Sequence, residues 1–430
     1  MNPALMTTSS RREAQAARPR VLLVISAQPP DGLAGAVAAG REPRRDYAML
    51  RAALQADLLC PADARRTRLG RLIARAAGIR PALAWAAFRR RRSYDAIYTD
   101  GENVGLPLAL LLKLRGRRAG RPRHVMLTHY LSTRPKRILF RLGAGSHVDT
   151  LIVHSSAQRQ LAIRELRMPA ERVALLPYFA DAAFWRPGAA PGDGGERSPE
   201  GGLPLICAVG LEFRDYDTLV RAARGLAAEI RIAAASSWSH HAAFAASPNL
   251  PANISVQSYT YLPLRDLYAA ASVVVVPLKD VDNQAGITVI LEAMAMSKPV
   301  IVTATRGQTD VVRDRRNVGR GRVMREWWPG FVDAPEVAAT LGDLPTGFYV
   351  TPSDADELRR AIQYLLDYPD VAGELGRNGR RVVESLFSLD AFTARFAAVI
   401  RGETPPLLLP VIREERELSR QFETPPLPPP

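Results

Sequence analysis

Three residues, Gln284, Gly286 and Glu292, fall where a chain can build a binding site for an anion. The run just before them, residues 272–277, reads SVVVVP, and an apolar run without polar alternation is typical of a parallel strand that is covered on both faces. A helix is predicted over about 287–296, because Pro299 prevents it from continuing much further. A strand, a glycine-containing loop and a helix N-terminus together present free N–H groups and the positive end of the helix dipole. The stretch is therefore predicted to bind a phosphate or a similar group.

Residues 284–300 read QAGITVILEAMAMSKPV, and this line resembles the Glu-x7-Glu motif of group 1 (family 4-type) glycosyltransferases. Gln284 stands where that family usually has its first glutamate. The resemblance implies an α/β protein with the GT-B fold, in which two Rossmann-like, doubly wound parallel-sheet domains face each other across a cleft. It also implies retaining transfer from a nucleoside-diphosphate sugar, without a metal and without a permanently bound cofactor. Glu292 would then contact the ribose and Gln284 the donor sugar. The N–H groups of Gly286, Ile287 and Thr288 would hold the departing phosphate.

Two cations are candidates for the diphosphate. Arg214 follows an apolar strand at 205–209 and offers a two-pronged guanidinium to a phosphate. In the resembling family the corresponding turn reads G-R-L-x-x-x-K-G, and Arg214 stands in place of its lysine. Lys279 ends the strand that precedes the anion site, and a solvated surface lysine is an equal interpretation of it.

The first half of the chain offers further candidates. His129 ends the predicted strand HVMLTH, and the family places a histidine near the donor sugar at this point; a polar cap on the strand is the alternative. Asp100 and Glu102 follow another strand and are weaker acidic candidates. Gly32 and Gly35 lie in the first loop, predicted over 28–40, which in the family lies against donor and acceptor. A plain flexible turn explains each glycine equally well.

Strands alternate with helices along the chain, which predicts parallel sheets built by crossover connections. We expect an acceptor-side domain over 19–186 and a donor domain over 204–388, joined by a Pro- and Gly-rich linker at 187–203. A terminal helix at 389–402 can cross back to the first domain. Residues 1–18 are predicted to be disordered, 313–345 to form an insertion, and 403–430 to form a mobile tail.

The 430-residue chain has a formal net charge of +15, carried almost wholly by arginine. Such an excess favours anionic partners, although arginine spread over the surface by codon bias explains it as well. Residues 65–92 contain ten arginines and no acidic residue, a composition typical of a helix that lies on an anionic membrane, or of a surface helix that packs on a sheet. No run is long enough to span a membrane. We expect a cytoplasmic protein, able to contact the inner face of the plasma membrane, that binds no nucleic acid.

The resemblance implies a glycosyltransferase, and the basic segment 65–92 favours a lipid-linked or cell-envelope glycan as its acceptor. A sugar-nucleotide epimerase on the same fold is one alternative; a phosphorylase fits less well, because lysine is scarce. A binding protein without catalytic activity is another alternative, in which Gln284 marks the loss of an essential glutamate. The donor base, the sugar, the linkage and the oligomeric state do not follow from the sequence.

Overall fold

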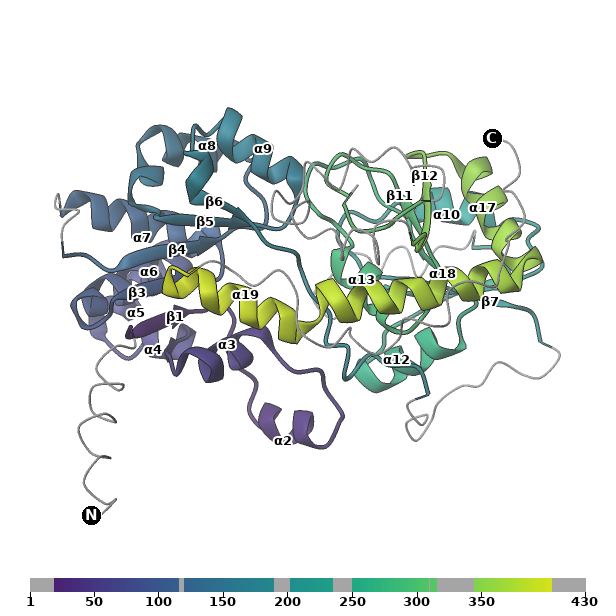
Figure 1. The fold of residues 1–430 in the computed structure, drawn as a ribbon, viewed down its shortest axis with the longest axis horizontal. Helices are drawn as coiled ribbons and strands as arrows, with labels where there is room; N and C mark the ends of the chain where they lie inside the picture. The colour runs from purple at the N-terminus through teal and green to yellow at the C-terminus, as the bar shows by residue number, and fades with distance from the viewer. Residues whose placement is uncertain are drawn as a thin grey trace, which may run out of the picture.

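The computed structural model describes residues 19–115, 120–188, 202–234, 250–308, 310–314 and 344–403. They form two α/β lobes that lie side by side (Figure 1), each built on a six-stranded sheet whose neighbouring strands are all parallel. The predicted fold class is therefore confirmed. The predicted disordered N-terminus, the insertion and the tail lie almost wholly outside the described residues, as does most of the predicted linker.

The N-terminal lobe contains a sheet with the strand order β2-β1-β3-β4-β5-β6. Its strands are β1 (Val21–Val24), β2 (Asp57–Leu59), β3 (Ala96–Thr99), β4 (Arg123–Leu127), β5 (Thr150–Val153) and β6 (Val173–Leu175). Its helices are α2 (Leu33–Ala38), α3 (Asp46–Leu54), α4 (Pro61–Ala64), α5 (Arg68–Ala77), α6 (Ile79–Arg90), α7 (Glu102–Leu114), α8 (Arg134–Arg141) and α9 (Ser156–Arg164), with short turns η2 (Arg91–Ser93), η3 (Ala144–His147) and η4 (Ala170–Arg172).

Both faces of this sheet are covered, which explains why its strands are apolar without alternation. On one face Leu22 and Val24 of β1 pack with residues of α6 and α7. On the other face Leu23 packs with α3 and with Phe392 and Phe396 of α19 (Leu389–Arg401). Burying one such side chain stabilises the fold by about 1.5–3 kcal/mol. The two faces are thus covered by helices from both ends of the chain: α3, α6 and α7 from the first part and α19 from the last.

The C-terminal lobe contains a sheet with the order β12-β11-β10-β7-β8-β9. Its strands are β7 (Leu205–Val209), β8 (Glu229–Ala233), β9 (Ile254–Gln257), β10 (Val273–Val276), β11 (Val300–Thr303) and β12 (Gly347–Val350). Its helices are α10 (Tyr216–Ala223), α12 (Tyr261–Ala270), α13 (Ile287–Ala295), α17 (Ala355–Asp367) and α18 (Pro369–Val382). Val274 and Val276 pack with α13 on one face, and Val273 and Val275 pack with α10 and α17 on the other.

The chain crosses between the lobes twice, and the two crossings touch. A π-helical turn, η5 (Val383–Phe387), leads from α18 into α19, so that a long helical run lies across both lobes (Figure 1). Ala180, on the first crossing, bonds through its backbone to Phe387 and Leu389 on the second, with N···O distances of 2.8 and 2.9 Å. Arg44 donates to the carboxylates of Asp181 and Asp390, which ties both crossings to the N-terminal lobe.

Three local predictions were wrong or incomplete. The expected loop at 28–40 contains the short helix α2. Strand β2 was not predicted, because its three residues include the exposed Asp57 and show no apolar run. The basic segment 65–92 forms two helices rather than one, because Gly78 between them has φ +90°, which a helix cannot include. No helix among the described residues is long and apolar enough to cross a membrane.

Candidate active site

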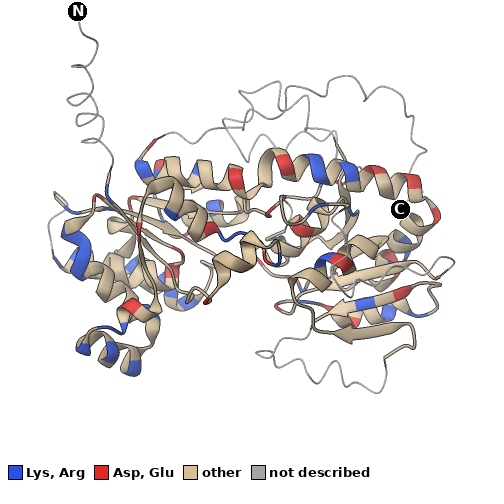
Figure 2. Ribbon diagram, turned by 90° about the horizontal axis from the view of Figure 1, so that it is seen from below, with Lys and Arg blue, Asp and Glu red and all other residues tan. Residues whose placement is uncertain are grey.

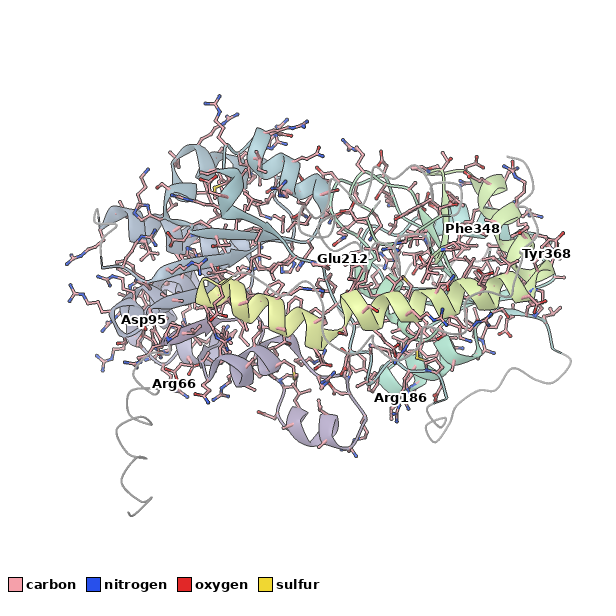
Figure 3. All side chains as sticks on the ribbon, in the orientation of Figure 1. Arg66, Asp95, Arg186, Glu212, Phe348 and Tyr368 are labelled. Atoms are coloured by element: carbon pink, nitrogen blue, oxygen red, sulfur yellow. The ribbon has the colours of Figure 1, made fainter. Side chains whose placement is uncertain are left out.

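A cavity of about 390 Å³ lies between the two lobes. In the C-terminal sheet the strand order reverses between β7 and β10, and ligands of such sheets bind where the loops after these two strands diverge. Glu212, which is labelled between the lobes in Figure 3, belongs to the loop after β7 and lies at this cavity. We call this space the interlobe cavity; its wall is formed by Thr128, His129, His154, Gln158 and Tyr178 from the first half of the chain, and by 210–214 and 283–289 from the second.

The N-terminus of α13 forms one end of the interlobe cavity. Gly286 precedes the helix with φ +77°, and a Cβ there would lie 2.7 Å from Cγ1 of Val276. Only glycine therefore lets the loop approach β10 so closely. The first N–H groups of a helix have no partner within it. That of Ile287 makes only a long contact, at 3.4 Å, with the backbone carbonyl of Gln284, so an anion at the positive end of the helix dipole can compete for it.

Arg214 lies beside this helix N-terminus. Its Nε donates to the carbonyl of Val209 and its Nη1 to that of Glu212, both at 2.9 Å. Gly210, with φ +103°, leaves room for the guanidinium, which a Cβ would strike. Burial lowers the pKa of Arg214, but an arginine stays charged in proteins. The guanidinium is thus a fixed, desolvated positive charge that a phosphate could neutralise.

Four buried polar atoms in the cavity wall have no partner among the described residues: Nε2 of His154 and the side-chain carbonyl oxygens of Gln158, Asn283 and Gln284. All four accept hydrogen bonds. The ring of His154 faces the carbonyl of Leu176 through Nδ1 at 2.9 Å, so Nδ1 carries the proton and Nε2 is the acceptor. Burial lowers the pKa of His154 to about 3, which keeps it neutral.

The orientation of two of these acceptors, His154 and Gln158, is fixed by their neighbours. Gln158 donates through Nε2 to the carbonyl of His129 at 2.6 Å, so its oxygen is free. Because buried polar groups are nearly always paired, four unpaired acceptors around one cavity indicate a ligand that brings several hydroxyl or N–H donors. Together with Arg214 and α13, the wall suits a molecule that is anionic at one end and rich in hydroxyls at the other.

His129 is held at the rim by three contacts. Its N–H donates to Glu102 at 3.0 Å, its carbonyl accepts from Gln158, and its Nε2 lies 2.9 Å from the carbonyl of Asp100. Since a carbonyl only accepts, Nε2 carries the ring proton and Nδ1 is the basic nitrogen. Burial alone would raise the pKa of Glu102, but its hydrogen bond to Lys136, at 2.6 Å, and the lysine charge lower it.

Glu292 lies deeper than the sequence suggested. It is buried beneath the loop, accepts from the hydroxyl of Tyr268 at 3.1 Å, and is not among the residues lining the cavity. Burial raises its pKa to about 8, against the lowering effect of Tyr268. In the unliganded protein the carboxyl group is therefore mainly protonated at neutral pH.

Three other predicted site residues lie away from the interlobe cavity. Lys279 is exposed, and its backbone, not its side chain, bonds to Phe213. Gly32 is the N-cap of α2 and Gly35 lies within that helix; nothing lies within 4 Å of a Cβ at either position. Among the described residues no group of three or more His, Cys, Asp or Glu is arranged to hold a metal ion.

The sequence argument missed several residues of the wall. His154 directly follows β5, and the rule that selected His129 at the end of β4 would have selected it as well. Asn283 adjoins Gln284 and carries the same amide chemistry. Tyr178, whose side chain hydrogen-bonds to that of Thr288 across the lobes, was not among the predicted site residues. Gln158 lies inside a helix, and no local signal distinguishes it.

The basic segment 65–92 divides into a packed part and an exposed part. Helix α6 buries Ala82, Leu83, Ala84, Ala86 and Ala87 against the sheet. On α5, in contrast, Leu69 and Leu72 are 47% and 62% exposed. Figure 2 shows basic positions on helices of both lobes, so the positive charge is not confined to α5.

Comparisons with known proteins agree with this geometry. Residues 204–326 match the sequence model of the family described as "Glycosyl transferases group 1". The resemblance drawn from 284–300 is thus confirmed for this part of the chain. No curated protein matches the chain.

Solved structures match most of the chain in fold. Sucrose-phosphate synthase from Thermosynechococcus elongatus is 18% identical, with a TM-score of 0.61 over 89% of this chain and 98% of its own. HepE from Anabaena in complex with UDP and glucose is 14% identical, with a TM-score of 0.61 over 89% and 99%. Trehalose 6-phosphate synthase from Burkholderia multivorans is 14% identical, with a TM-score of 0.56 over 89% and 98%. At these identities the likeness establishes the GT-B fold.

Proposed function

We propose that the protein transfers a glycosyl group from a nucleoside-diphosphate sugar to an acceptor hydroxyl. The observation that carries this proposal is the wall of the interlobe cavity, where four unpaired acceptor atoms face the same space as Arg214 and the N-terminus of α13. A sugar supplies the hydroxyl donors that these atoms lack, and a diphosphate supplies the negative charge. We assign 204–388 to donor binding and 19–186 to the acceptor, with 187–203 as linker and 389–402 as the returning helix.

The proposed reaction breaks the bond between the anomeric carbon and the diphosphate and forms a bond from that carbon to the acceptor oxygen, on the same face of the sugar. Arg214 and the N–H groups of Gly286, Ile287 and Thr288 stabilise the charge that grows on the departing phosphate. That phosphate takes the proton of the acceptor hydroxyl. Gln284 can orient a sugar hydroxyl but supplies no negative charge, so the mechanism rests on the phosphate and needs no metal or permanently bound cofactor.

UDP-glucose is the first donor to test, because HepE, which shares the fold, has been solved with UDP-glucose. The wall explains why a hydroxyl-rich sugar would bind, but every common hexose carries such hydroxyls. The base would lie toward the loop 210–214, where Phe213 is partly exposed. The choice of base and sugar is left to a donor panel.

We propose a glycan acceptor that is lipid-linked or belongs to the cell envelope, used by a cytoplasmic enzyme at the inner face of the membrane. The support is α5, where exposed Leu69 and Leu72 lie among Arg68, Arg71 and Arg75. Helices of this kind lie in the interface of anionic bilayers. Flotation with liposomes tests this: binding should need anionic lipid and weaken in Leu69→Ser/Leu72→Ser. Equal flotation at every lipid charge would contradict it.

The experiment that tests the activity has two parts. A thermal-shift screen with UDP, GDP and ADP and their sugars finds the nucleotide, since a ligand of the native state raises the melting temperature. Release of that nucleotide from its sugar donor is then measured with and without acceptors. Nucleotide binding without release, across a wide donor and acceptor set, would favour the binding protein that Gln284 suggests. Formation of an epimerised sugar nucleotide would favour the epimerase.

A further inference from the structure

A second cavity, of about 290 Å³, lies at the carboxyl ends of the N-terminal strands. The strand order of that sheet reverses between β1 and β3, so the loops after these strands diverge and leave a crevice. We call it the β1–β3 cavity; its wall is formed by Leu23, Ile25, Ala27, Gln28, Pro30, Arg45, Asp46, Tyr47, Tyr98 and Asp100. The volume is at the lower end of the range for ligand pockets, which suits one small ring.

Three buried polar atoms of this wall have no partner among the described residues: the hydroxyls of Tyr47 and Tyr98 and Oδ1 of Asp100. Tyr98 is only 2% exposed. The other oxygen of Asp100 accepts from the N–H and the hydroxyl of Ser26 at 2.6 and 2.9 Å, so the free oxygen is held in place. An unpaired buried hydroxyl costs about 1–3 kcal/mol. Two unpaired hydroxyls and one unpaired carboxylate oxygen around one cavity point to a ligand with both donors and acceptors.

The charges around the cavity disfavour an anionic ligand. Asp46 and Asp100 both line it, and each raises the free energy of a second negative charge nearby. Arg45 is the basic residue of the wall, but its Nη1 donates to the hydroxyl of Tyr261 and its Nη2 to Glu42, both at 2.9 Å. The guanidinium is therefore engaged, and a phosphate or carboxylate in the cavity would meet two acidic side chains.

The β1–β3 cavity adjoins the interlobe cavity through His129. The imidazole of His129 lines the interlobe cavity, and its Nε2 is bonded to the carbonyl of Asp100, whose side chain lines the other. A ring held by Asp100 and Tyr98 would thus lie beside a sugar held by His154 and Gln158. That is the relation that two reacting sugar units need.

We propose that the β1–β3 cavity holds the accepting unit, and that this unit is a sugar ring without a negative charge. Its hydroxyls donate to Oδ1 of Asp100 and accept from Tyr47 and Tyr98. An amino sugar belongs to the same class, because its ammonium group would face two carboxylates, whereas phosphorylated sugars and uronates are rejected. The role of this ring as an acceptor rests on the proposed function. Binding of the ring in the β1–β3 cavity does not, because it needs no donor.

Binding is tested first, without any donor. Saturation-transfer NMR is recorded with methyl α-glucoside, methyl α-mannoside, methyl α-galactoside and glucosamine, and with glucose 6-phosphate and glucuronate. We expect transfer to at least one uncharged or amino sugar, and its loss in Tyr98→Phe and Tyr47→Phe. These changes remove only unpaired hydroxyls, so they should leave the melting temperature equal or higher. Tyr94→Phe is the control. Tyr94 lies just before β3 in the same lobe, and its hydroxyl bonds to Asp57 and not to the β1–β3 cavity.

Turnover is tested next, with the donor that the nucleotide screen identifies. The uncharged acceptor should accelerate nucleotide release, and Tyr98→Phe should raise its KM about tenfold, the worth of one hydrogen bond, with an unchanged donor KM. Selective binding of glucose 6-phosphate or glucuronate, no binding of any sugar, or equal binding by the native protein and Tyr98→Phe would overturn the proposal. Sugar binding without nucleotide release would leave the cavity assigned and refute the transferase instead.

Discussion

Replacing Glu292 with glutamine should make the protein more stable at neutral pH. In the folded protein burial raises the pKa of Glu292 from the ordinary 4.5 to about 8. The folded state therefore keeps a proton that the unfolded state releases, and the free energy of unfolding falls as the pH rises from about 4.5 to about 8. At about 1.36 kcal/mol for each pH unit, the loss is about 3 kcal/mol at pH 7 and about 4 kcal/mol at pH 8, where the folded group is half ionised.

Glutamine has nearly the same shape and can still accept from Tyr268, but it does not ionise. The variant should therefore match the wild type near pH 4.5 and exceed it progressively up to pH 8. Urea denaturation followed by fluorescence at pH 5, 6, 7 and 8, without nucleotide, measures the difference. Glu374→Gln, on α18, is the control for the same substitution at a partly buried position. A difference that is constant across pH would refute the reasoning, because Glu292 would then be ionised in the fold.

The same variant tests the predicted contact with ribose. If ribose hydroxyls donate to Glu292, they favour its ionised form, and nucleotide binding then releases the proton. The affinity of the wild type for UDP, or for the nucleotide that the screen selects, should rise between pH 6 and pH 8. The affinity of Glu292→Gln should be weaker and independent of pH over this interval. Isothermal titration in two buffers of different ionisation enthalpy would detect the released proton directly.

Three further changes address the rest of the interlobe cavity. Arg214→Ala should weaken nucleotide binding about ten- to hundredfold, the worth of a charge-assisted hydrogen bond, by thermal shift and titration; unchanged affinity would remove Arg214 from the site. Gly286→Ala should lower the melting temperature and weaken nucleotide binding, since its φ is +77° and the added Cβ would lie 2.7 Å from Val276. His129→Ala should lower kcat more than it raises the donor KM in the release assay; the opposite split would make His129 a binding residue.

The sheets were predictable because several of their strands, such as β1, β7, β10 and β11, are apolar runs. Val273–Val276 needs cover on both faces, and that requirement alone predicts a parallel sheet with helices on both sides. Strand β2 was not predicted because it is an edge strand of only three residues, which begins with the exposed Asp57 and reaches a buried position only at Leu59. Helix α2 was not predicted from the sequence because it buries none of its residues, so it has no apolar stripe to detect.

The site was predictable where one local segment builds it. Gln284, Gly286 and Thr288 lie on one loop and the helix that follows, and a glycine before a helix is a signal within the sequence. Gln158 reaches the same cavity from α9, more than a hundred residues earlier, and only the docking of the lobes brings it there. The depth of Glu292 was also hidden, because the hydroxyl that it accepts from belongs to α12.

The two lobes, between which the interlobe cavity lies, are joined in two different ways. Backbone hydrogen bonds pair the crossings at Ala180, whereas the lobes meet across the cleft through side chains. Ser132 donates to Asp282 at 3.1 Å, and the N–H and hydroxyl of Ser156 donate to Asp310 at 2.7 and 2.9 Å. Hydrogen bonds to a charged carboxylate are worth about 1.5–3 kcal/mol each. The lobes are thus joined through the backbone at Ala180 and through the side chains of Asp282 and Asp310 across the cleft.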